Sequence, residues 1–301
     1  MKIQDIGERK VIEKIWSFIG RDNEDEDVHF LPSGERYILL AIDTINENFH
    51  FERWWDPELI GRFLVDINLS DIAAKNGAPR EFMASFSLPG DVDQDWIISL
   101  VKGINEEGSK YGVTFQGGDL KESGKISLTG LAIGEVEMGK EFRRSGAKPG
   151  DFVYVTSPIG RVERGIVNYY NSSGDYRWIL DIKPRFDALE IMRKYRVTSC
   201  IDNSDGLYKS LGLISKLSNV GISIENDVSV DARDEAEREL FFSLGGDYEL
   251  IFTSPDRISE FPLVGRVTEG SGVFGTDGRA VNTLGYDHFS PNISNIKKRG
   301  K

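Results

Sequence analysis

The sequence predicts an α/β (α+β) protein with two domains, residues 1–140 and 141–301. Three observations support this prediction. The chain has 301 residues, enough for two domains of ordinary size. Segments with strand-like alternation and segments with apolar residues at helical spacing take turns along most of its length. Residues 143–151 (RRSGAKPGD) combine glycine, proline and charge, as a domain junction does.

The first half is expected to contain three helices and five strands. The helices, recognised by their apolar spacing, are expected at 2–19, 57–76 and 92–111. The strands are expected at 28–31, 37–42, 81–89, 113–116 and 125–136. An acidic loop is expected at 20–27, and two glycines follow the short fourth strand.

After the junction the alternation of strand and helix resumes. Strands are expected within 152–157, 220–227 and 249–255, and helices at 185–195 and 204–218. No segment repeats at a fixed short period.

Composition excludes several classes of function. The formal net charge is −12, the opposite of the basic surface of a nucleic-acid-binding protein. No apolar run approaches the length needed to span a bilayer, and the N-terminal segment has no signal-peptide core. Cys200 is the only cysteine, which suits a reducing compartment. A cytoplasmic protein without nucleic-acid or membrane partners is therefore expected.

Aspartates recur where apolar stretches give way to polar or glycine-rich sequence. They are Asp43, Asp71, Asp119, Asp202 and Asp205. Carboxylates beside core-forming sequence are costly to bury unless a positive charge meets them. Mg²⁺ takes oxygen ligands and is usually shared between carboxylates and substrate phosphates. The pattern indicates magnesium-dependent chemistry on a nucleotide phosphate.

Asp71 is the clearest of these candidates. The apolar stripe of the expected helix consists of Ile60, Leu64, Ile67 and Ala74. Asp71 falls in the middle of this stripe, whereas Asp66 falls on the side expected to face solvent. A carboxylate centred on a buried face either ligates a metal or is hydrogen-bonded as a structural aspartate.

Two glycine-containing motifs add phosphate chemistry. In Gly117-Gly118-Asp119 the glycines permit close backbone approach to a ligand, although a Gly-Gly turn after a strand is common. The segment 202–206 (DNSDG) precedes an amphipathic helix, a position that suits a metal with a phosphate or a plain N-cap. There is no P-loop motif and no GxGxxG before a helix.

Together these motifs resemble the thiamine-monophosphate kinase family of the aminoimidazole ribonucleotide synthetase (PurM-like) superfamily. The matching blocks, in order, are IDTINENFHF, VDINLSDIAAKNGAPREF, YGVTFQGGD, RRSGAKPGDFVYVT, SCIDNSDGLYKSLG, GGDYELIFT and GYDHF. The resemblance implies a two-domain PurM-like fold. Its N-terminal mixed or antiparallel sheet, with helices, would form a barrel across a homodimer, and its C-terminal domain would be an α/β sandwich.

The resemblance also implies a reaction and residue roles. The reaction is ATP-dependent phosphorylation of thiamine monophosphate to thiamine diphosphate with Mg²⁺. The implied metal ligands are Glu26, Asp43, Asp71, Asp119, Asp202 and Asp205, of which Asp43, Asp71, Asp119 and Asp202 act catalytically through the metal. The implied ATP contacts are Gly117, Gly118, Asp119, Arg144 and Ser204. The implied substrate contacts are His50, Asp247 and Tyr286.

The chain departs from the family pattern in three places. Ala41-Ile42 precedes Asp43 where the family has hydroxyl side chains. The acidic loop offers Asp25, Glu26 or Asp27 for an upstream carboxylate, and spacing favours Glu26. The segment 245–250 (GGDYEL) is one residue shorter than the family motif, with Asp247 in the place of the substrate-contacting acid.

The expected mechanism is direct in-line phosphoryl transfer without a phosphoenzyme. Three alternatives remain open from the sequence. The first is another enzyme of the superfamily, with a different phosphate acceptor. The second is a catalytically weak homologue that binds nucleotide. The third is a protein whose acidic clusters form a structural cation-binding surface.

Overall fold

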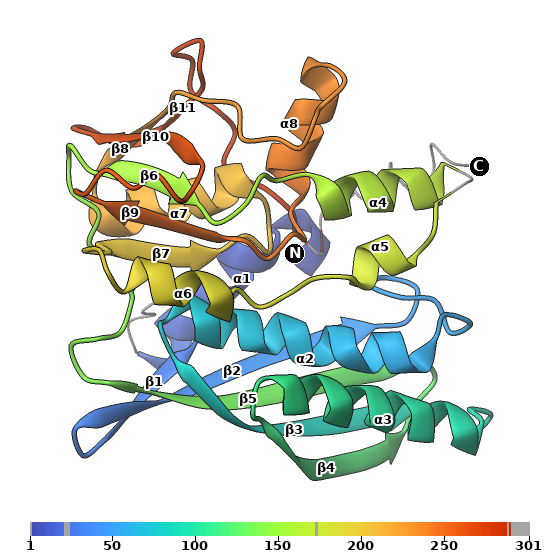
Figure 1. The fold of residues 1–301 in the computed structure, drawn as a ribbon. Helices are drawn as coiled ribbons and strands as arrows, with labels where there is room; N and C mark the ends of the chain where they lie inside the picture. Colours follow the sequence, from blue (N-terminus) through green and yellow to red (C-terminus); the bar gives the residue numbers. More distant parts are fainter. Residues whose placement is uncertain (1, 21–24, 172–173, 288, 290–301) are drawn as a thin grey trace.

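The computed structural model describes residues 2–20, 25–171, 174–287 and 289. These residues form two β-sheets, one from each half of the chain, with helices between and around them (Figure 1). The predicted mixed α/β class is confirmed.

The N-terminal sheet has five strands in the order β1-β2-β5-β3-β4. Their bounds are β1 His29–Ser33, β2 Arg36–Asn46, β3 Ala78–Leu88, β4 Thr114–Glu122 and β5 Ser127–Glu137. All neighbours pair antiparallel except β3 and β4, which run parallel and are joined through a helix. The sheet is buried on the face covered by α2 (Pro57–Ala74) and α3 (Gln94–Lys110).

Helix α2 is the central element of the molecule. Asp56 caps its first turn by accepting from the backbone N–H of Glu58, and Pro57 stands at its first position. It lies between the N-terminal sheet and the C-terminal half (Figure 1), so most of its residues are buried. A Cβ at Gly103 would lie 2.0 Å from the Glu58 carbonyl oxygen, so glycine is what lets α3 approach α2 so closely.

The C-terminal sheet has six strands in the order β11-β8-β10-β6-β9-β7. Their bounds are β6 Phe152–Val155, β7 Ser199–Asp202, β8 Gly221–Ile224, β9 Leu250–Ser254, β10 Leu263–Thr268 and β11 Gly272–Phe274. The remaining helices are η1 Ile3–Asp5, α1 Glu8–Ile19, α4 Arg161–Tyr170, α5 Arg177–Leu180, α6 Phe186–Met192, α7 Leu207–Ser218 and α8 Glu235–Leu244.

Several local predictions need correction. The helix expected at 2–19 is interrupted, because Gly7 adopts φ +78° between η1 and α1. Asp43 lies inside β2 rather than at its end, and Gly117–Asp119 lies inside β4 rather than after it. Helices α4, α5 and α8 and strands β10 and β11 were not expected. No helix among the described residues is long and apolar enough to cross a membrane.

Candidate metal and nucleotide site

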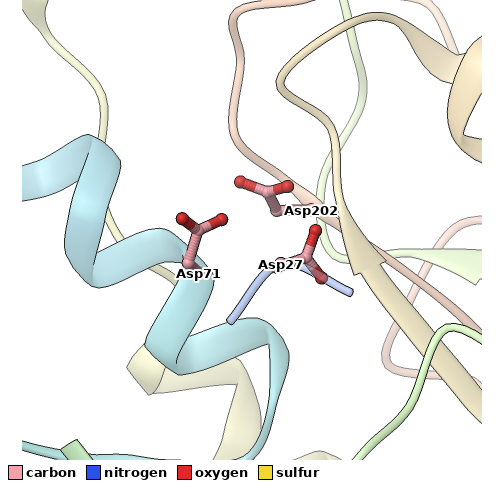
Figure 2. Close-up of side chains that lie close together, drawn as sticks. All are labelled: Asp27, Asp71 and Asp202. Carbon is pink, nitrogen blue, oxygen red and sulfur yellow. The ribbon is translucent and has the colours of Figure 1, made fainter. Parts of the chain in front are cut away.

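Three carboxylates from distant segments converge between the two halves of the chain. Asp27 precedes β1, Asp71 is on α2, and Asp202 ends β7. Each offers an oxygen, and these oxygens all lie within 4.8 Å of one another. Figure 2 shows the three side chains lying close together, with Asp71 on the helix. It is the one group of three or more potential metal-ligating residues found within the described ranges.

The three carboxylates differ in how their charge is compensated. Burial opposes ionisation of Asp27, but Arg144 and Lys75 outweigh it and lower the pKa of Asp27. Burial, followed by the carboxylates of Asp43 and Asp202, raises the pKa of Asp71 well above its ordinary value. Burial, followed by the nearby Asp27, raises the pKa of Asp202 to about 7. Asp71 and Asp202 therefore form an all-oxygen pair that needs protons or a cation.

Helix α2 also forms hydrogen bonds to strands β7 and β2, which carry Asp202 and Asp43. The Ser70 hydroxyl donates to Asp202 Oδ2 at 2.9 Å. The backbone N–H of Asp43 donates to Asn68 Oδ1 at 3.0 Å, which ties β2 to the helix. Asn68 and Ser70 lie on α2 within one turn of Asp71, so this helix positions Asp43 and Asp202 as well as Asp71. Sequence reasoning missed Asn68 and Ser70, because a buried polar residue in an apolar helix was the only signal.

A cavity of about 270 Å³ opens beside the carboxylate cluster. Five residues predicted for the site line it, namely Asp43, His50, Ser204, Asp205 and Tyr286. The backbone N–H of Asn46 donates to His50 Nδ1 at 3.0 Å, which fixes the imidazole ring. The backbone N–H of Tyr286 donates to the Asp205 carbonyl oxygen at 3.1 Å, which brings the C-terminal segment to the cavity.

Aromatic and aliphatic side chains form the rest of the cavity wall. They come from both halves of the chain and include Phe49, Trp55, Phe63, Ile166, Tyr170 and Tyr248. A wall of this kind with a few polar groups suits a flat organic ring rather than a phosphate alone.

Glu26, which spacing favoured as the upstream carboxylate, lies outside the cluster of three carboxylates. Its carboxylate is 2.7 Å from Lys75 Nζ and accepts the backbone N–H of Arg144 at 3.1 Å. Asp27, the next residue, faces Asp71 and Asp202 instead. Arg144, expected to contact ATP, bonds Asp27 and the Asp25 carbonyl oxygen through its guanidinium group. Asp27 rather than Glu26 therefore belongs to the carboxylate cluster, and the metal-ligand role of Glu26 stays a prediction.

Asp119 is separated from the cluster within one protomer. The register places it in one row with Thr44, Thr129 and Ser85 across the sheet, next to the row that contains Asp43. Neighbouring residues on a strand point to opposite faces, so Asp119 points away from α2. Its side chain is 56% exposed and lies 3.3 Å from Lys121 Nζ.

The two glycines before Asp119 have structural explanations. Gly117 adopts φ +88°, a backbone region that favours glycine. A Cβ at Gly118 would lie 1.5 Å from the Ala84 carbonyl oxygen of the adjacent strand. Glycine is therefore required by the sheet at both positions, and their contact with ATP stays a prediction.

Asp247 lies behind the cavity wall rather than on it. Its carboxylate accepts the backbone N–H groups of Gly160 and Val162 at the start of α4. It is buried, whereas its neighbours Gly246 and Tyr248 line the cavity. This geometry makes Asp247 a helix cap, and its contact with substrate stays a prediction.

The structure corrects the prediction that Asp66 faces solvent. It is only 4% exposed, because Glu107 of α3 and the segment 180–182 cover that side of α2. Helical spacing identified the face of α2 that packs on the N-terminal sheet. It did not indicate that other residues cover the side of α2 that carries Asp66.

Asn203 is a further polar residue that the sequence motif did not single out. It lies between Asp202 and Ser204, is fully buried, and its side-chain amide atoms have no hydrogen-bond partner within the described part of the chain. An unpaired buried amide at this point calls for a bound polar partner.

Comparisons with known proteins identify relatives in sequence and in fold. A family model described as "AIR synthase related protein, N-terminal domain" matches residues 24–136. Thiamine-monophosphate kinase of Pyrococcus abyssi is 31% identical over 304 residues, covering 95% of this chain and 97% of the relative. The enzyme of the same name from Archaeoglobus fulgidus is 34% identical, covering 87% and 90%. A solved structure described as AaThiL complexed with AMPPCP and TMP matches with a TM-score of 0.86 at 26% identity, covering 96% and 99%.

The two-sheet fold and the carboxylate cluster between its halves define a protein of the AIR-synthase-related class, with the PurM-like fold that the sequence predicted. Within that class, the identity to curated relatives over nearly their whole length is decisive. The chain belongs to the thiamine-monophosphate kinase family.

Proposed function

We propose that this chain transfers the terminal phosphoryl group of ATP to the phosphate of thiamine monophosphate and so produces thiamine diphosphate and ADP. Family membership supports this function, as does a relative of the same fold whose solved complex contains AMPPCP and TMP. The observation that carries the proposal is the convergence of Asp27, Asp71 and Asp202 next to the cavity lined by aromatic residues.

Mg²⁺ is the cation that best fits the cluster. The donors are oxygens only, and Asp71 and Asp202 have pKa values raised by burial and by neighbouring carboxylates. Asp27, Asp71 and Asp202 would hold the ion, with Asp43 and Asp205 close enough to the cavity to share further ions. When bound, Mg²⁺ supplies positive charge that offsets repulsion between the two phosphates.

The residues of the chain position the two anions for in-line transfer. An oxygen of the acceptor phosphate attacks the γ-phosphorus, and the bond from that phosphorus to the bridging oxygen of ADP breaks. No general base is required, because the attacking oxygen of a phosphate monoester already carries negative charge near neutral pH. We assign His50 and Tyr286, which line the cavity, to the thiamine part of the acceptor. Arg144, beside Asp27, is assigned to the ATP phosphates.

We further propose that the protein is a homodimer joined through the uncovered face of the N-terminal sheet. Ile42 is 68% exposed there, and the register places it in one row with Leu131 and Met83. Leu31 is also exposed on this face, opposite Ile38. Contiguous apolar side chains on an uncovered sheet face are characteristic of a protein interface.

The dimer gives Asp119 a role that one protomer does not. It lies on the same face as the apolar row, in the row two residue positions further along the strands. We propose that it acts at the interface, next to the site of the partner subunit. The division into domains 1–140 and 141–301 is part of the same proposal and is supported by the two separate sheets.

An assay of ADP release with three acceptors compared side by side tests the function. Thiamine monophosphate, thiamine and an aminoimidazole ribonucleotide precursor are each supplied with ATP and Mg²⁺. We expect turnover with thiamine monophosphate and product that co-migrates with thiamine diphosphate. Turnover with the aminoimidazole precursor alone would assign a different enzyme of the superfamily, and ATP binding without turnover would assign a catalytically weak homologue.

A further inference from the structure

Lys75 is a fully buried lysine next to the carboxylate cluster. It follows the last residue of α2 and has 0% exposure. Its Nζ lies 2.7 Å from Glu26 Oε2 and 2.5 Å from Asp27 Oδ2, and it donates to the Cys200 carbonyl oxygen at 3.2 Å. The ammonium group is thus surrounded by two carboxylate oxygens, which form ion pairs with it, and one carbonyl oxygen, which accepts a hydrogen bond from it. Such a buried charge is maintained only by its partners.

The contacts of Lys75 reach every segment that carries a ligand of the cluster. It binds Asp27 directly. Through Cys200 it holds β7 two residues before Asp202. Its own helix carries Asp71 one turn earlier, on the same side. One ammonium group thus joins three segments whose relative placement decides where the oxygens lie.

Charge in the buried cluster divides into two parts. Glu26 and Asp27 contact Lys75 and Arg144. Asp25 also lies near Arg144 and is paired with Arg9, so this part contains three negative charges and three positive charges. Asp71 and Asp202 have no lysine or arginine partner in any ion pair of the described chain, which leaves two negative charges for one divalent ion. Without Lys75, the same ion would face three uncompensated carboxylates.

We propose, on the basis of the function proposed above, that Lys75 is a positioning residue that acts as a fixed cation of the metal site. It neutralises Glu26 and holds Asp27 toward Asp71 and Asp202, so that a single divalent ion completes the charge balance. The role is distinct from catalysis, because Lys75 is fully buried and is not one of the residues that line the cavity.

Direct titration with Mn²⁺, a spectroscopic substitute for Mg²⁺, tests this role without requiring activity. Free Mn²⁺ is measured by electron paramagnetic resonance in the full-length protein and in the variants Lys75→Met, Glu26→Gln and Lys75→Met/Glu26→Gln. Methionine has a similar length and no charge, so it fills the same space. Loss of such an outer contact typically weakens metal binding about 10–100-fold.

We expect Lys75→Met to raise the Kd for Mn²⁺ at least about tenfold. The double variant, which restores equal positive and negative charge, should return to within about threefold of the unsubstituted protein. Unchanged or tighter Mn²⁺ binding in Lys75→Met would overturn the proposal. If Lys75→Met does not fold, the double variant is the test. Near-normal Mn²⁺ binding by the double variant would support the proposal. Mn²⁺ binding as weak as that of Asp71→Asn, a variant that lacks one ligand, would contradict it.

The result of the Mn²⁺ titration can be distinguished from the result of the turnover assay that tests the proposed function. Absence of turnover with thiamine monophosphate would refute the kinase while leaving the Mn²⁺ titration interpretable. A purely structural role for Lys75 would lower the thermal midpoint of Lys75→Met and leave the Kd for Mn²⁺ unaltered, which again contradicts the proposal.

Discussion

At the level of single residues, partner charges separate acids that look alike in sequence. Asp27 and Asp71 both approach the same point, yet burial and neighbouring charges shift their pKa values in opposite directions. Asp27 has Arg144 and Lys75 beside it, whereas Asp71 has other carboxylates. Asp71 is thus the acid with most to gain from a bound cation.

Asp71→Asn removes a ligand without changing the size of the side chain. We expect ADP release to fall more than about 100-fold, because phosphoryl transfer depends on fixed positive charge at the phosphates. In Mg²⁺-free buffer the thermal midpoint should be equal or higher, since one buried carboxylate beside Asp202 is gone. Asp95→Asn, at an exposed position in α3, is the control. Retained turnover in Asp71→Asn would remove the metal role from this residue.

Glu163 links stability to pH. It is fully buried in α4, and burial together with the Asp247 carboxylate raises its pKa well above the ordinary value of 4.5. The folded chain therefore holds a proton that the unfolded chain loses, and the free energy of unfolding falls as pH rises from about 4.5 toward the raised pKa. The slope for one such group is about 1.4 kcal/mol per pH unit.

Glu163→Gln remains neutral at every pH. We expect this variant to lose less stability than the unsubstituted protein between pH 5 and the raised pKa of Glu163, as measured by urea unfolding at a series of pH values. Glu235→Gln, on the exposed side of α8, controls for the loss of a surface carboxylate. Parallel stability curves for Glu163→Gln and the unsubstituted protein would show that Glu163 is ionised in the folded state.

Individual site residues were predictable to different degrees. Asp71 was recognisable because an acid within an apolar stripe is anomalous. Asp27 was not separable from Asp25 and Glu26, since the choice depends on Lys75 and Arg144, which lie far along the chain. Asp66 was misplaced because its cover comes from α3 and from residues beyond α5.

Among the elements, α2 and α3 cross at reciprocal glycines. A Cβ at Gly61 would lie 2.2 Å from the Leu100 carbonyl oxygen, and one at Gly103 would lie 2.0 Å from that of Glu58. Both contacts involve backbone atoms that no side-chain rotation can move. The crossing therefore holds α2, and with it Asp71, at a fixed depth.

Gly103→Ala should force the two helices apart. We expect a loss of about 1–3 kcal/mol in the free energy of unfolding, the usual cost of overpacking, measured by urea denaturation. Gly124→Ala is a matched control, because a Cβ there meets no atom within 4 Å and its φ is not positive. Equal stability of the two variants would mean that the crossing adapts easily.

Elements with a regular pattern were predictable, and those defined by long-range contacts were not. The apolar spacing identified α2 and α3 to within a few residues. The place of Gly117–Asp119 within β4 depends on parallel pairing with β3, which leaves no local pattern. Helix α8 lies in a polar, charge-rich stretch whose buried face is only a few residues wide.

For the whole molecule, the uncovered apolar sheet face is the feature that one chain leaves unexplained. Ile42→Asp places a charge in the middle of this face. We expect the variant to elute as a folded monomer with its mass halved, as measured by light scattering after size exclusion. Ile98→Asp, at an exposed position on α3 on the other side of the sheet, should retain the dimer. A monomeric unsubstituted protein would refute the proposed interface.

The order of the C-terminal sheet could not be derived from the sequence. Its central strands β10 and β6 are more than 100 residues apart. The PurM-like fold was nevertheless predictable, because seven ordered motifs carry information that local periodicity lacks.

The three carboxylates of the cluster belong to segments that only the folded interface between the sheets brings together. An ion bonded to all three would join the two halves of the chain directly, in addition to the connecting residues 138–151, which Arg144 ties to Glu26 and Asp25. Chelation should then do more than remove charge: it should also weaken the contact between the two halves. A truncated gene encoding residues 1–140 would retain Asp27 and Asp71, and one encoding residues 141–301 would retain only Asp202, so neither product would hold the complete cluster.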